Sequence, residues 1–422
     1  MNRWVKVVGI VVVLVVVGIT SLGVGIVIGS TGLGGIFAGS AANAEQPEEF
    51  DIFWQAWDTV QRHFVDREAL DPQVMTYGAI RGMVEALGDE GHTSFLTAEE
   101  RERQTTELSG TFFGIGAQLG VREQLPVIVA PFDGSPADQA GVKAGDIILR
   151  VDGEDVTSLP LNDIVTLIRG PEGTDVTLSL LRPEENITVE VTITRGEIKV
   201  PAATWAMIPG TSIALIRLSQ FTANGEADII RSLREAQEAE ATAMILDVRN
   251  NPGGLLEQAI NVTSQFLEDG NVLLEEDADG NRRAYAVKEG GIGTELPMVV
   301  LINGGSASSS EILAGAVQDH ARGELVGQTT FGTGTVLQPY ILKDGSALLL
   351  GTRQWLTPEG RLIRKQGISP DYEVPLPIEA DLLTPEEVEE LEPEEIAASE
   401  DAQLLKAIEV LGVTFEEVTV AE

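Results

Sequence analysis

The pattern of apolar and polar positions begins with a long apolar run near the N-terminus. Residues Val7 to Ile28 include no charged side chain, and Arg3 and Lys6 precede them. At the helical rise of about 1.5 Å per residue, a run of this length reaches about 33 Å, which is enough to cross the hydrocarbon core of a bilayer. The basic flank predicts that the N-terminus stays in the cytoplasm and that the rest of the chain lies outside it.

A tract of small residues follows this run and ends in Ala42-Asn43-Ala44, which fits the small-x-small pattern of a leader cleavage site. The apolar run is long for a leader peptide. We therefore favour an uncleaved signal anchor over residues 1–45, with a cleaved signal peptide as the alternative. In both cases the bulk of the chain is predicted to be extracytoplasmic. It would be periplasmic or at the cell surface if anchored, and secreted if the leader is cleaved.

Helical periodicity dominates the next segment, residues 46–108. Aromatic and aliphatic residues at three- and four-residue steps predict an amphipathic helix with a core-facing stripe, formed by Phe50, Phe53, Trp54, Trp57, Val60 and Phe64. A second helix is predicted over Val74 to Leu87. The spacing Thr97-x-x-Glu100 predicts a capping box at the start of a short third helix.

Short β runs alternate with turns in residues 109–198, which predicts one small mixed domain. The runs have strand composition and comprise Val127–Ala130, Asp146–Val151 and Val176–Leu181. A tight turn is expected at Asp152-Gly153. Leu161 to Ile168 has the pattern of a short amphipathic helix.

Strands alternate with helices in residues 199–375, and this alternation is typical of an α/β core. The predicted strands include Ser212–Leu218, Ala243–Arg249 and Pro297–Ile302. The predicted helices include Glu226–Glu238, Leu255–Leu267 and Ser309–Asp319. The chain is therefore expected to be a multidomain protein with an α/β core.

The last segment, residues 376–422, is strongly acidic. From Glu379 to the end it holds fifteen acidic residues against one basic residue, Lys406. The charge run over residues 386–395 is predicted to be solvated or mobile, as charge runs usually are. Asp401 to Leu411 is predicted to form a small helix that docks on the body of the protein.

Composition and charge exclude several classes of function. Lys and Arg number 28 against 66 Asp and Glu, a formal net charge of −38, which argues against nucleic-acid binding because phosphate contacts need basic side chains. The chain has no cysteine and only three histidines, His63, His92 and His320. A thiolate site is excluded and a histidine-rich metal site is disfavoured, so we expect neither a metal nor an organic cofactor.

Candidate chemistry lies within the predicted α/β core. Pro297 to Gly315 reads as a strand, a glycine turn and a helix, with Ser308 at the junction, where free N–H groups of a helix N-terminus would favour an oxyanion. Ser308-x-x-Glu311 is also the pattern of a plain capping box, so nucleophile and cap both stay open. Asn251-Pro252-Gly253-Gly254 is either an ordinary turn or a loop that presents N–H groups to a ligand.

Several of these motifs, in this order, resemble the carboxyl-terminal processing peptidases, also called tail-specific serine proteases. The matching strings are Asp247–Gly254, Gly305–Glu311, Gly327–Gly334, Leu356–Arg361 and Gly367–Asp371. The resemblance runs from about residue 50 to about residue 411. It implies an α/β core related to the crotonase and caseinolytic protease folds, with a PDZ domain inserted before it and a helical segment at the N-terminus.

The resemblance also implies roles for individual residues. Ser308 would be the nucleophile, the N–H groups of Gly253 and Ser309 would form the oxyanion hole, and Glu311 would support the nucleophile helix. The PDZ-like strings are Gly134–Ala137 and Ala140–Gly153. A substrate C-terminus would bind a carboxylate loop made of Gly114, Ile115, Gly116 and Ala117, and the peptide would add as a strand. The implied partners are proteins or peptides with exposed C-termini. The apolar run adds the membrane as a partner through the N-terminal helix, and a homo-oligomer stays open.

The chain departs from the family at two positions of the catalytic machinery, and the first is the general base. The family's general base is a lysine 25 residues after the serine, and Thr333 stands there in this chain. The usual supporting glutamine is also displaced, since Leu337 holds its position and Gln338 follows. A threonine hydroxyl has no basicity near pH 7 comparable to that of a neutral lysine, so the Ser–Lys mechanism is not implied.

Two other groups are candidates for the missing base. His92 lies in a segment that resembles a motif near the cleft of these enzymes, and a histidine near its ordinary pKa is a suitable base. Lys365 is the second candidate. The sequence thus predicts an extracytoplasmic serine endopeptidase that recognises protein C-termini. The alternative is a pseudopeptidase that binds C-terminal peptides as an adaptor or scaffold.

Overall fold

The computed structural model describes residues 47–89, 92–122, 124–132, 134–183, 185–377 and 380–413. The predicted membrane span at residues 7–28 and the predicted cleavage site lie outside these ranges. Within them, no helix combines the length and the apolar character needed to span a bilayer. The chain divides into two compact units, one ending at Met75 and one beginning at Thr76.

The first unit contains helix α3 (Phe50–His63) and the start of α4 (Pro72–Glu85). The amphipathic helix predicted there is present, but the expectation that its aromatic stripe is buried is wrong, because α3 has no buried residue. The aromatic rings instead contact one another along the helix. The ring centroids of Phe53 and Trp54 are 5.2 Å apart and those of Phe53 and Trp57 are 6.2 Å apart.

The second unit begins with the rest of α4, followed by strand β1 (Ser94–Leu96) and helix α5 (Ala98–Ser109). The predicted capping box starts α5, since the Glu100 N–H donates to Thr97 Oγ1 at 3.1 Å and the Thr97 N–H donates to Glu100 Oε2 at 2.8 Å. Gly110 ends the helix with a left-handed φ of 68°. A capping box at the start and a left-handed glycine at the end fix both limits of α5.

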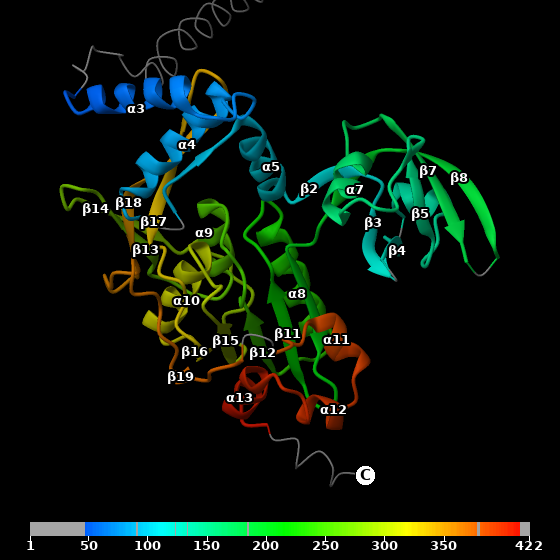
Figure 1. Cartoon of the computed structure of the whole chain (residues 1–422). Coiled ribbons are helices and arrows are strands. Elements are labelled where there is room, and N and C mark those ends of the chain that lie inside the picture. The colour runs from blue at the N-terminus through cyan, green and yellow to red at the C-terminus, as the bar shows by residue number, and fades with distance from the viewer. Residues whose placement is uncertain are drawn as a thin grey trace, which may run out of the picture. The chain divides into compact units, whose positions relative to one another are not determined.

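Residues 111–199 form a small β domain (Figure 1). The strands β2 (Thr111–Gly114) and β9 (Gly196–Lys199) pair with each other. Between them lies a sheet in the order β3-β4-β5-β7-β8, with β6 paired to β5. The bounds of its elements are β3 Ala117–Arg122, β4 Leu125–Pro131, α6 Pro136–Gln139, β5 Ile147–Val151, β6 Glu154–Asp155, α7 Leu161–Ile168, β7 Asp175–Arg182 and β8 Ile187–Thr194. The strands and the helix predicted in this segment are confirmed.

The α/β core is built on a sheet in the order β10-β11-β12-β15-β16-β19. All neighbours pair in parallel except β10 and β11, which are antiparallel. The strands are β10 Ala203–Met207, β11 Ile213–Leu218, β12 Ala243–Asp247, β15 Met298–Ile302, β16 Glu324–Gly327 and β19 Tyr372–Glu373. The helices between them are α8 Gly225–Glu238, α9 Leu256–Ser264 and α10 Ser309–Asp319.

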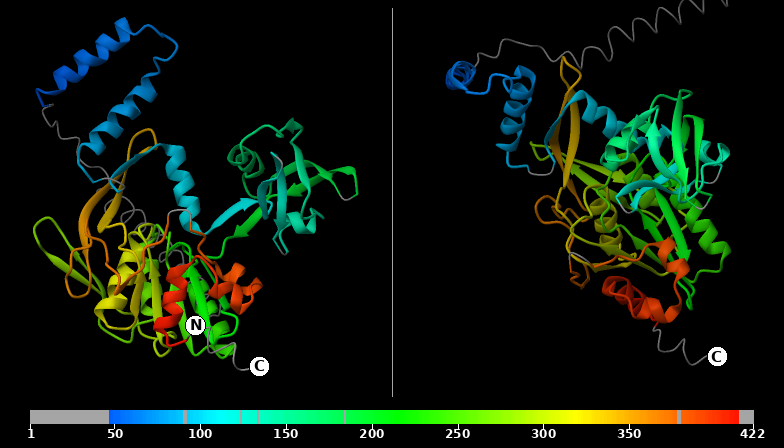
Figure 2. Two further views of the ribbon diagram at one scale, coloured as in Figure 1. Left: turned by 60° about the horizontal axis from the view of Figure 1, so that its bottom comes forward. Right: turned by 45° about the vertical axis from the view of Figure 1, so that its right-hand side comes forward.

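Alternate side chains of the central strands point to opposite faces of this sheet, as strand geometry requires. Leu246 and Val300 pack with α8, α9 and α10 on one face. Ile245 and Leu301 pack on the other face with the C-terminal helices α11 (Pro385–Glu390), α12 (Pro393–Ala397) and α13 (Ala402–Val410). The core is therefore a three-layer sandwich, and Figure 2 shows the orange and red C-terminal helices against the green strands.

The acidic run over residues 386–395 is solvated along its glutamates, as predicted, but it also contains a buried apolar residue. Its glutamate side chains are exposed, but Val388 is fully buried within the core, as is Ile396 just beyond the run. The two apolar residues are eight positions apart and lie on two different short helices. The surrounding charges therefore give no periodic apolar pattern from which their burial could be predicted. The helix predicted over Asp401 to Leu411 is confirmed as α13.

A second sheet joins strand β1, which precedes the β domain in sequence, to strands that follow it. Its order is β1-β18-β13-β14, and β17 also pairs with β18. The strands are β13 Asn271–Glu276, β14 Arg282–Ala286, β17 Thr335–Ile341 and β18 Ala347–Leu356. Because Ser94 lies opposite Leu349 in this sheet, residues near 92 come close to residues near 335.

Candidate active site

Ser308 lies at the junction between strand β15 and helix α10, as predicted. It precedes the first residue of α10 and has φ 54° and ψ −111°. A positive φ is strained for a residue with a side chain and persists only where the surroundings impose it. The side chain is half-buried, so it is accessible in part to solvent. The turn therefore holds one hydroxyl group at the start of a helix, where unpaired N–H groups and a partial positive charge gather.

The glycine turn after β12 lies directly against this serine. β12 and β15 are parallel neighbours, so the loops at their carboxyl ends meet at one edge of the sheet. A Cβ atom placed on Gly253 would lie 2.8 Å from Ser308 Cβ and 2.9 Å from the Ser309 nitrogen. One placed on Gly254 would lie 2.3 Å from the Phe221 oxygen. Both positions therefore need glycine, because any side chain would collide with the Ser308 loop or with residue 221.

Asn251 joins the two loops. Its backbone oxygen accepts hydrogen bonds from the Ala307 N–H at 3.0 Å and from Ser310 Oγ at 2.9 Å. Its side-chain nitrogen donates to the Leu218 oxygen at 2.7 Å. The sequence analysis gave Asn251 no role, yet its bonds fix the distance between the glycine turn and Ser308.

The two amides implied as oxyanion donors differ in their bonding. The Gly253 N–H donates to Asn251 Oδ1 at 2.9 Å, within the turn itself. The Ser309 N–H stands at the first position of α10, where a helix has no internal acceptor to offer. The Ser309 N–H therefore has no acceptor within its own helix. The Gly253 amide would have to exchange its bond to Asn251 for one to substrate.

Glu311 is the centre of a buried network beneath the serine. Its carboxylate accepts hydrogen bonds from the Ser308 N–H (2.9 Å), Thr330 Oγ1 (2.7 Å), the Gly332 N–H (2.6 Å) and the Thr333 N–H (3.0 Å). The Thr333 hydroxyl also donates to Glu311, and it accepts from the Ser308 N–H at 2.7 Å. Glu311 thus ties the loop of residues 330–333 to the turn that holds Ser308.

Thr333 occupies the place of the family's lysine but has a different function in this network. Its single hydroxyl proton is donated to the Glu311 carboxylate, and its oxygen already receives the Ser308 N–H. Such a hydroxyl cannot accept a second proton near pH 7. Thr333 therefore forms a bridge between Ser308 and Glu311.

This bridge leads to a prediction about stability. Thr333→Val keeps the shape of the side chain but leaves the buried Glu311 carboxylate without one donor, so we expect a loss of about 1–3 kcal/mol. Thr333→Ser keeps the hydroxyl and should lose less. The measurement is the thermal unfolding midpoint of the full chain for both variants. Equal midpoints for valine and serine would mean that the hydroxyl does not stabilise the turn.

His92 is buried close to this network. Its Nδ1 shares a hydrogen bond with Thr335 Oγ1, two residues beyond Thr333 on strand β17. Burial lowers the pKa of His92 below its ordinary value. The carboxylates of Asp89 and Glu311 oppose this effect, and the charge of Arg364 adds to it. A neutral imidazole is therefore favoured in the folded protein, which is the form that can accept a proton.

Asp89 holds the His92 segment in place. Its Oδ1 accepts from Arg364 at 2.7 Å and its Oδ2 accepts from Thr93 Oγ1 at 2.7 Å. Burial alone would raise the pKa of Asp89, but these hydrogen bonds outweigh it and the pKa is lowered. The carboxylate is therefore ionised at neutral pH and anchors the chain three residues before His92.

Comparison with known proteins decides the family. The sequence pattern of Peptidase family S41 matches residues 212–374, and that of the PDZ domain matches residues 127–182. A Carboxyl-terminal-processing protease of Synechocystis sp. is 36% identical over 81% of this chain and 85% of its own length. A Carboxy-terminal-processing protease of Bartonella bacilliformis is 38% identical over 73% of this chain and 71% of its own length. The chain belongs to the carboxyl-terminal-processing protease family.

A solved photosystem II D1 C-terminal processing protease is 29% identical to this member of the family, with a TM-score of 0.45. The match covers 78% of this chain and 93% of the solved chain. The fold that the resemblance implied is confirmed: an S41-type α/β core with a PDZ domain and a helical segment before it. The relatives named above are proteases by name.

The four residues of the predicted carboxylate loop lie between β2 and β3, just before the segment of this processing-protease homologue that matches the PDZ domain. The oxygens of Ile115 and Gly116 accept from the Ala137 N–H at 2.7 Å and the Phe132 N–H at 2.9 Å. Gly116 has φ 73°, and a Cβ there would lie 2.5 Å from Ser135 Cβ. Gly114 ends β2 and Ala117 begins β3, which is an edge strand of its sheet. The loop is therefore fixed by its own carbonyl groups, and it leads into a strand edge at which a peptide could add.

The other two candidates lie farther from the buried network. Gln338 is exposed on β17, opposite Leu350, and none of the bonds to Glu311 given above comes from it. Lys365 is exposed, and its backbone N–H donates to the Gly332 oxygen at 2.7 Å. The chain at Lys365 thus lies beside the Thr333 loop, while its side chain is at the surface.

Proposed function

We propose that this chain is an extracytoplasmic serine endopeptidase that captures protein C-termini with its PDZ domain and cleaves peptide bonds with Ser308. The observation that carries the proposal is the strained Ser308 at the start of α10, pressed against the Gly253 turn. A plain helix cap needs neither the positive φ nor the facing glycines. A nucleophile that must stand free above a helix N-terminus needs both.

His92 is the proposed general base. His92 Nδ1 shares a hydrogen bond with Thr335 Oγ1. In the proposed resting state the Nδ1–H would donate this bond, so that Nε2 would carry the lone pair that accepts a proton. Family members with a lysine have their base on the Thr333 loop. Here the base would come from the segment before β1, and Thr335 on β17 would orient it.

The proposed reaction has two stages. In the first, His92 takes the proton from Ser308 Oγ as this oxygen forms a bond to the peptide carbonyl carbon. The carbonyl oxygen becomes negative and is stabilised by the Ser309 N–H, and by the Gly253 N–H once it has left Asn251. The C–N bond then breaks, His92 gives its proton to the leaving nitrogen, and the acyl ester stays on Ser308.

The second stage regenerates the enzyme. A water molecule gives one proton to His92 and attacks the ester carbon. The ester C–O bond breaks, Ser308 Oγ regains a proton from His92, and the new carboxylate leaves. Every group in these steps belongs to the chain, the substrate or water.

Substrate capture is proposed at the edge of strand β3. A protein tail would pair with this strand, and its terminal carboxylate would meet the N–H groups of the Gly114–Ala117 loop. The predicted N-terminal anchor would hold the enzyme at the outer face of the cytoplasmic membrane, where unfolded tails of exported proteins are accessible.

Covalent labelling of Ser308 tests the proposal directly. The full chain in mild detergent is treated with a fluorophosphonate, which loses fluoride as Ser308 Oγ bonds to phosphorus. We expect one adduct by intact mass spectrometry, located on the peptide that contains Ser308, and cleavage of a peptide with a nonpolar free C-terminus. The Ser308→Ala variant should show neither.

A wild-type chain that binds such a peptide but neither reacts nor cleaves would overturn the proposal and leave a C-terminal-peptide binding protein.

A further inference from the structure

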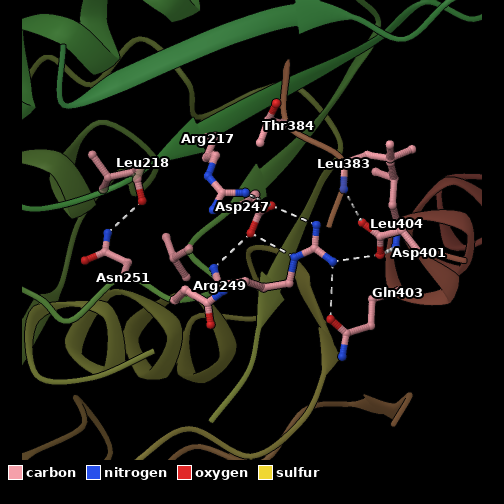
Figure 3. Close-up of polar contacts among 12 residues, drawn as sticks. Arg217, Leu218, Asp247, Arg249, Asn251, Leu383, Thr384, Asp401, Gln403 and Leu404 are labelled. Carbon is pink, nitrogen blue, oxygen red and sulfur yellow. Dashed lines mark hydrogen bonds and ion pairs between the residues drawn. The ribbon is translucent and has the colours of Figure 1, made fainter. Parts of the chain in front are cut away.

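The most deeply buried cation described in this protein is Arg249, the second residue after strand β12. The residue as a whole is 1% exposed. Nε and Nη2 donate to the two oxygens of Asp247 at 3.0 Å and 2.8 Å. The Arg249 backbone N–H donates to the same Asp247 Oδ1 at 2.8 Å. One carboxylate thus fixes both the guanidinium group and the backbone at the point where the chain leaves the strand, as Figure 3 shows.

A second carboxylate comes from the far end of the chain. Arg249 Nη1 donates to Asp401 Oδ1 at 2.7 Å and to Gln403 Oε1 at 3.3 Å. Asp401 is fully buried and caps helix α13 by accepting the Leu404 N–H at 3.0 Å. Its Oδ2 accepts the Leu383 N–H at 3.1 Å. Asp401 therefore binds three segments at once: α13, the stretch before α11, and the turn after β12.

The charges show why the second carboxylate matters. Arg217 also pairs with Asp247, at 3.5 Å. Without Asp401, two arginines would share a single carboxylate in a buried place, which leaves one positive charge uncompensated. Arg249 would then have to turn toward solvent or pull on Asp247, and both changes move the backbone N–H that Asp247 holds.

That backbone leads straight into the proposed oxyanion turn. Asn251 lies two residues after Arg249, and Gly253 lies four residues after Arg249. Asn251 makes the bonds to Ala307, Ser310 and Gly253 that set the turn against Ser308. The segment from 249 to 253 is thus held at one end by the ion pairs and at the other by the nucleophile loop.

We propose that Asp401 is a positioning residue for catalysis, which acts through Arg249 to set the Asn251–Gly253 turn at the distance from Ser308 that oxyanion binding needs. The inference rests on the proposed function. By this inference α13 supports the geometry of the active site, although α13 lies beyond residue 374, where the match to Peptidase family S41 ends. Asp401 itself touches no substrate.

The experiment compares Asp401→Asn with Glu409→Gln in the full chain. The first keeps the size and the capping oxygen but removes the charge that Arg249 needs. The second removes one carboxylate from the same helix at an exposed pair with Lys406. For Asp401→Asn we expect kcat on a peptide with a free C-terminus to fall at least tenfold with KM unchanged, because the PDZ domain still captures the tail.

Two further readouts separate positioning from a general loss of stability. The rate of fluorophosphonate labelling should fall in parallel with kcat. Hydrogen exchange of the amides from Asn251 to Leu255 should be faster than in wild type, while the PDZ strands exchange as before. Glu409→Gln should match wild type in all three measurements. Unchanged kcat, labelling rate and turn exchange in Asp401→Asn would overturn the inference.

A second variant covers the case in which Asp401→Asn does not accumulate as folded protein. Gln403→Leu removes only the 3.3 Å bond to Arg249 and the bond to the Val374 oxygen, and it should lower kcat two- to threefold with the same KM. Wild-type kcat for this variant would equally overturn the inference. If wild type itself neither labels nor cleaves, the proposed function fails, and hydrogen exchange at the turn still decides whether Asp401 positions it.

Discussion

Replacing Ser308 by alanine is expected to reduce kcat on a peptide with a free C-terminus by roughly 10⁴- to 10⁶-fold, as in other serine hydrolases that lose their nucleophile. The reason is chemical, since no other group in the proposed mechanism can form the acyl ester. KM should change little, because tail capture at the PDZ domain does not use the hydroxyl group. Cleavage is followed by mass spectrometry of the peptide products.

Ser369→Ala provides the matched control, since Ser369 is exposed on the loop that precedes β19. It should cleave at the wild-type rate. If Ser308→Ala kept more than about one hundredth of wild-type turnover, Ser308 could not be the nucleophile, and the glycine turn would have to serve another purpose.

Replacing His92 by asparagine is expected to lower kcat by roughly 10²- to 10⁴-fold, the usual contribution of a general base. The pH dependence supplies a second signature. Because burial lowers the pKa of His92, the imidazole is already neutral somewhat below pH 6.5. The wild-type kcat/KM should therefore rise with pH along a limb whose midpoint lies below 6.5 and be level at pH 7. This limb should be absent in His92→Asn.

Two companion variants sharpen the result. His63→Asn, on the exposed helix α3, should leave both kcat and the pH profile unchanged. Thr333→Lys restores the family's residue, but the new ammonium would stand beside the Glu311 carboxylate, which favours its charged form, so we expect no gain. A large gain in Thr333→Lys, with no loss in His92→Asn, would show that the base has been lost in this chain and not replaced.

Local sequence patterns predicted the elements around the site closely. The strand-turn-helix unit at residues 297–319 and the helix over Leu161 to Ile168 have the predicted bounds or nearly so. These patterns depend on periodicity and turn chemistry over a few residues. The resemblance then suggested the proposed roles of Ser308 and Gly253, which no local pattern could distinguish from those of a cap and a turn.

The contacts that complete the site could not be predicted in the same way, because they join residues far apart in the chain. His92 meets Thr335 only because β1 pairs with β18 and β18 with β17. Asp401 meets Arg249 only because α13 covers the sheet. Thr333 was predicted to be unable to serve as a base, and its bridge to Glu311 depends on a backbone turn that no sequence pattern specifies.

The pairing of β1 with β18 has a consequence for the order of biosynthesis. The strand next to the proposed base is made early, whereas its partner at residues 347–356 and the helix at 402–410 are made near the end. A partly synthesised chain therefore contains the histidine but not yet the strands against which it is placed. In the proposed mechanism, the catalytic site can form only after synthesis of the chain is nearly finished.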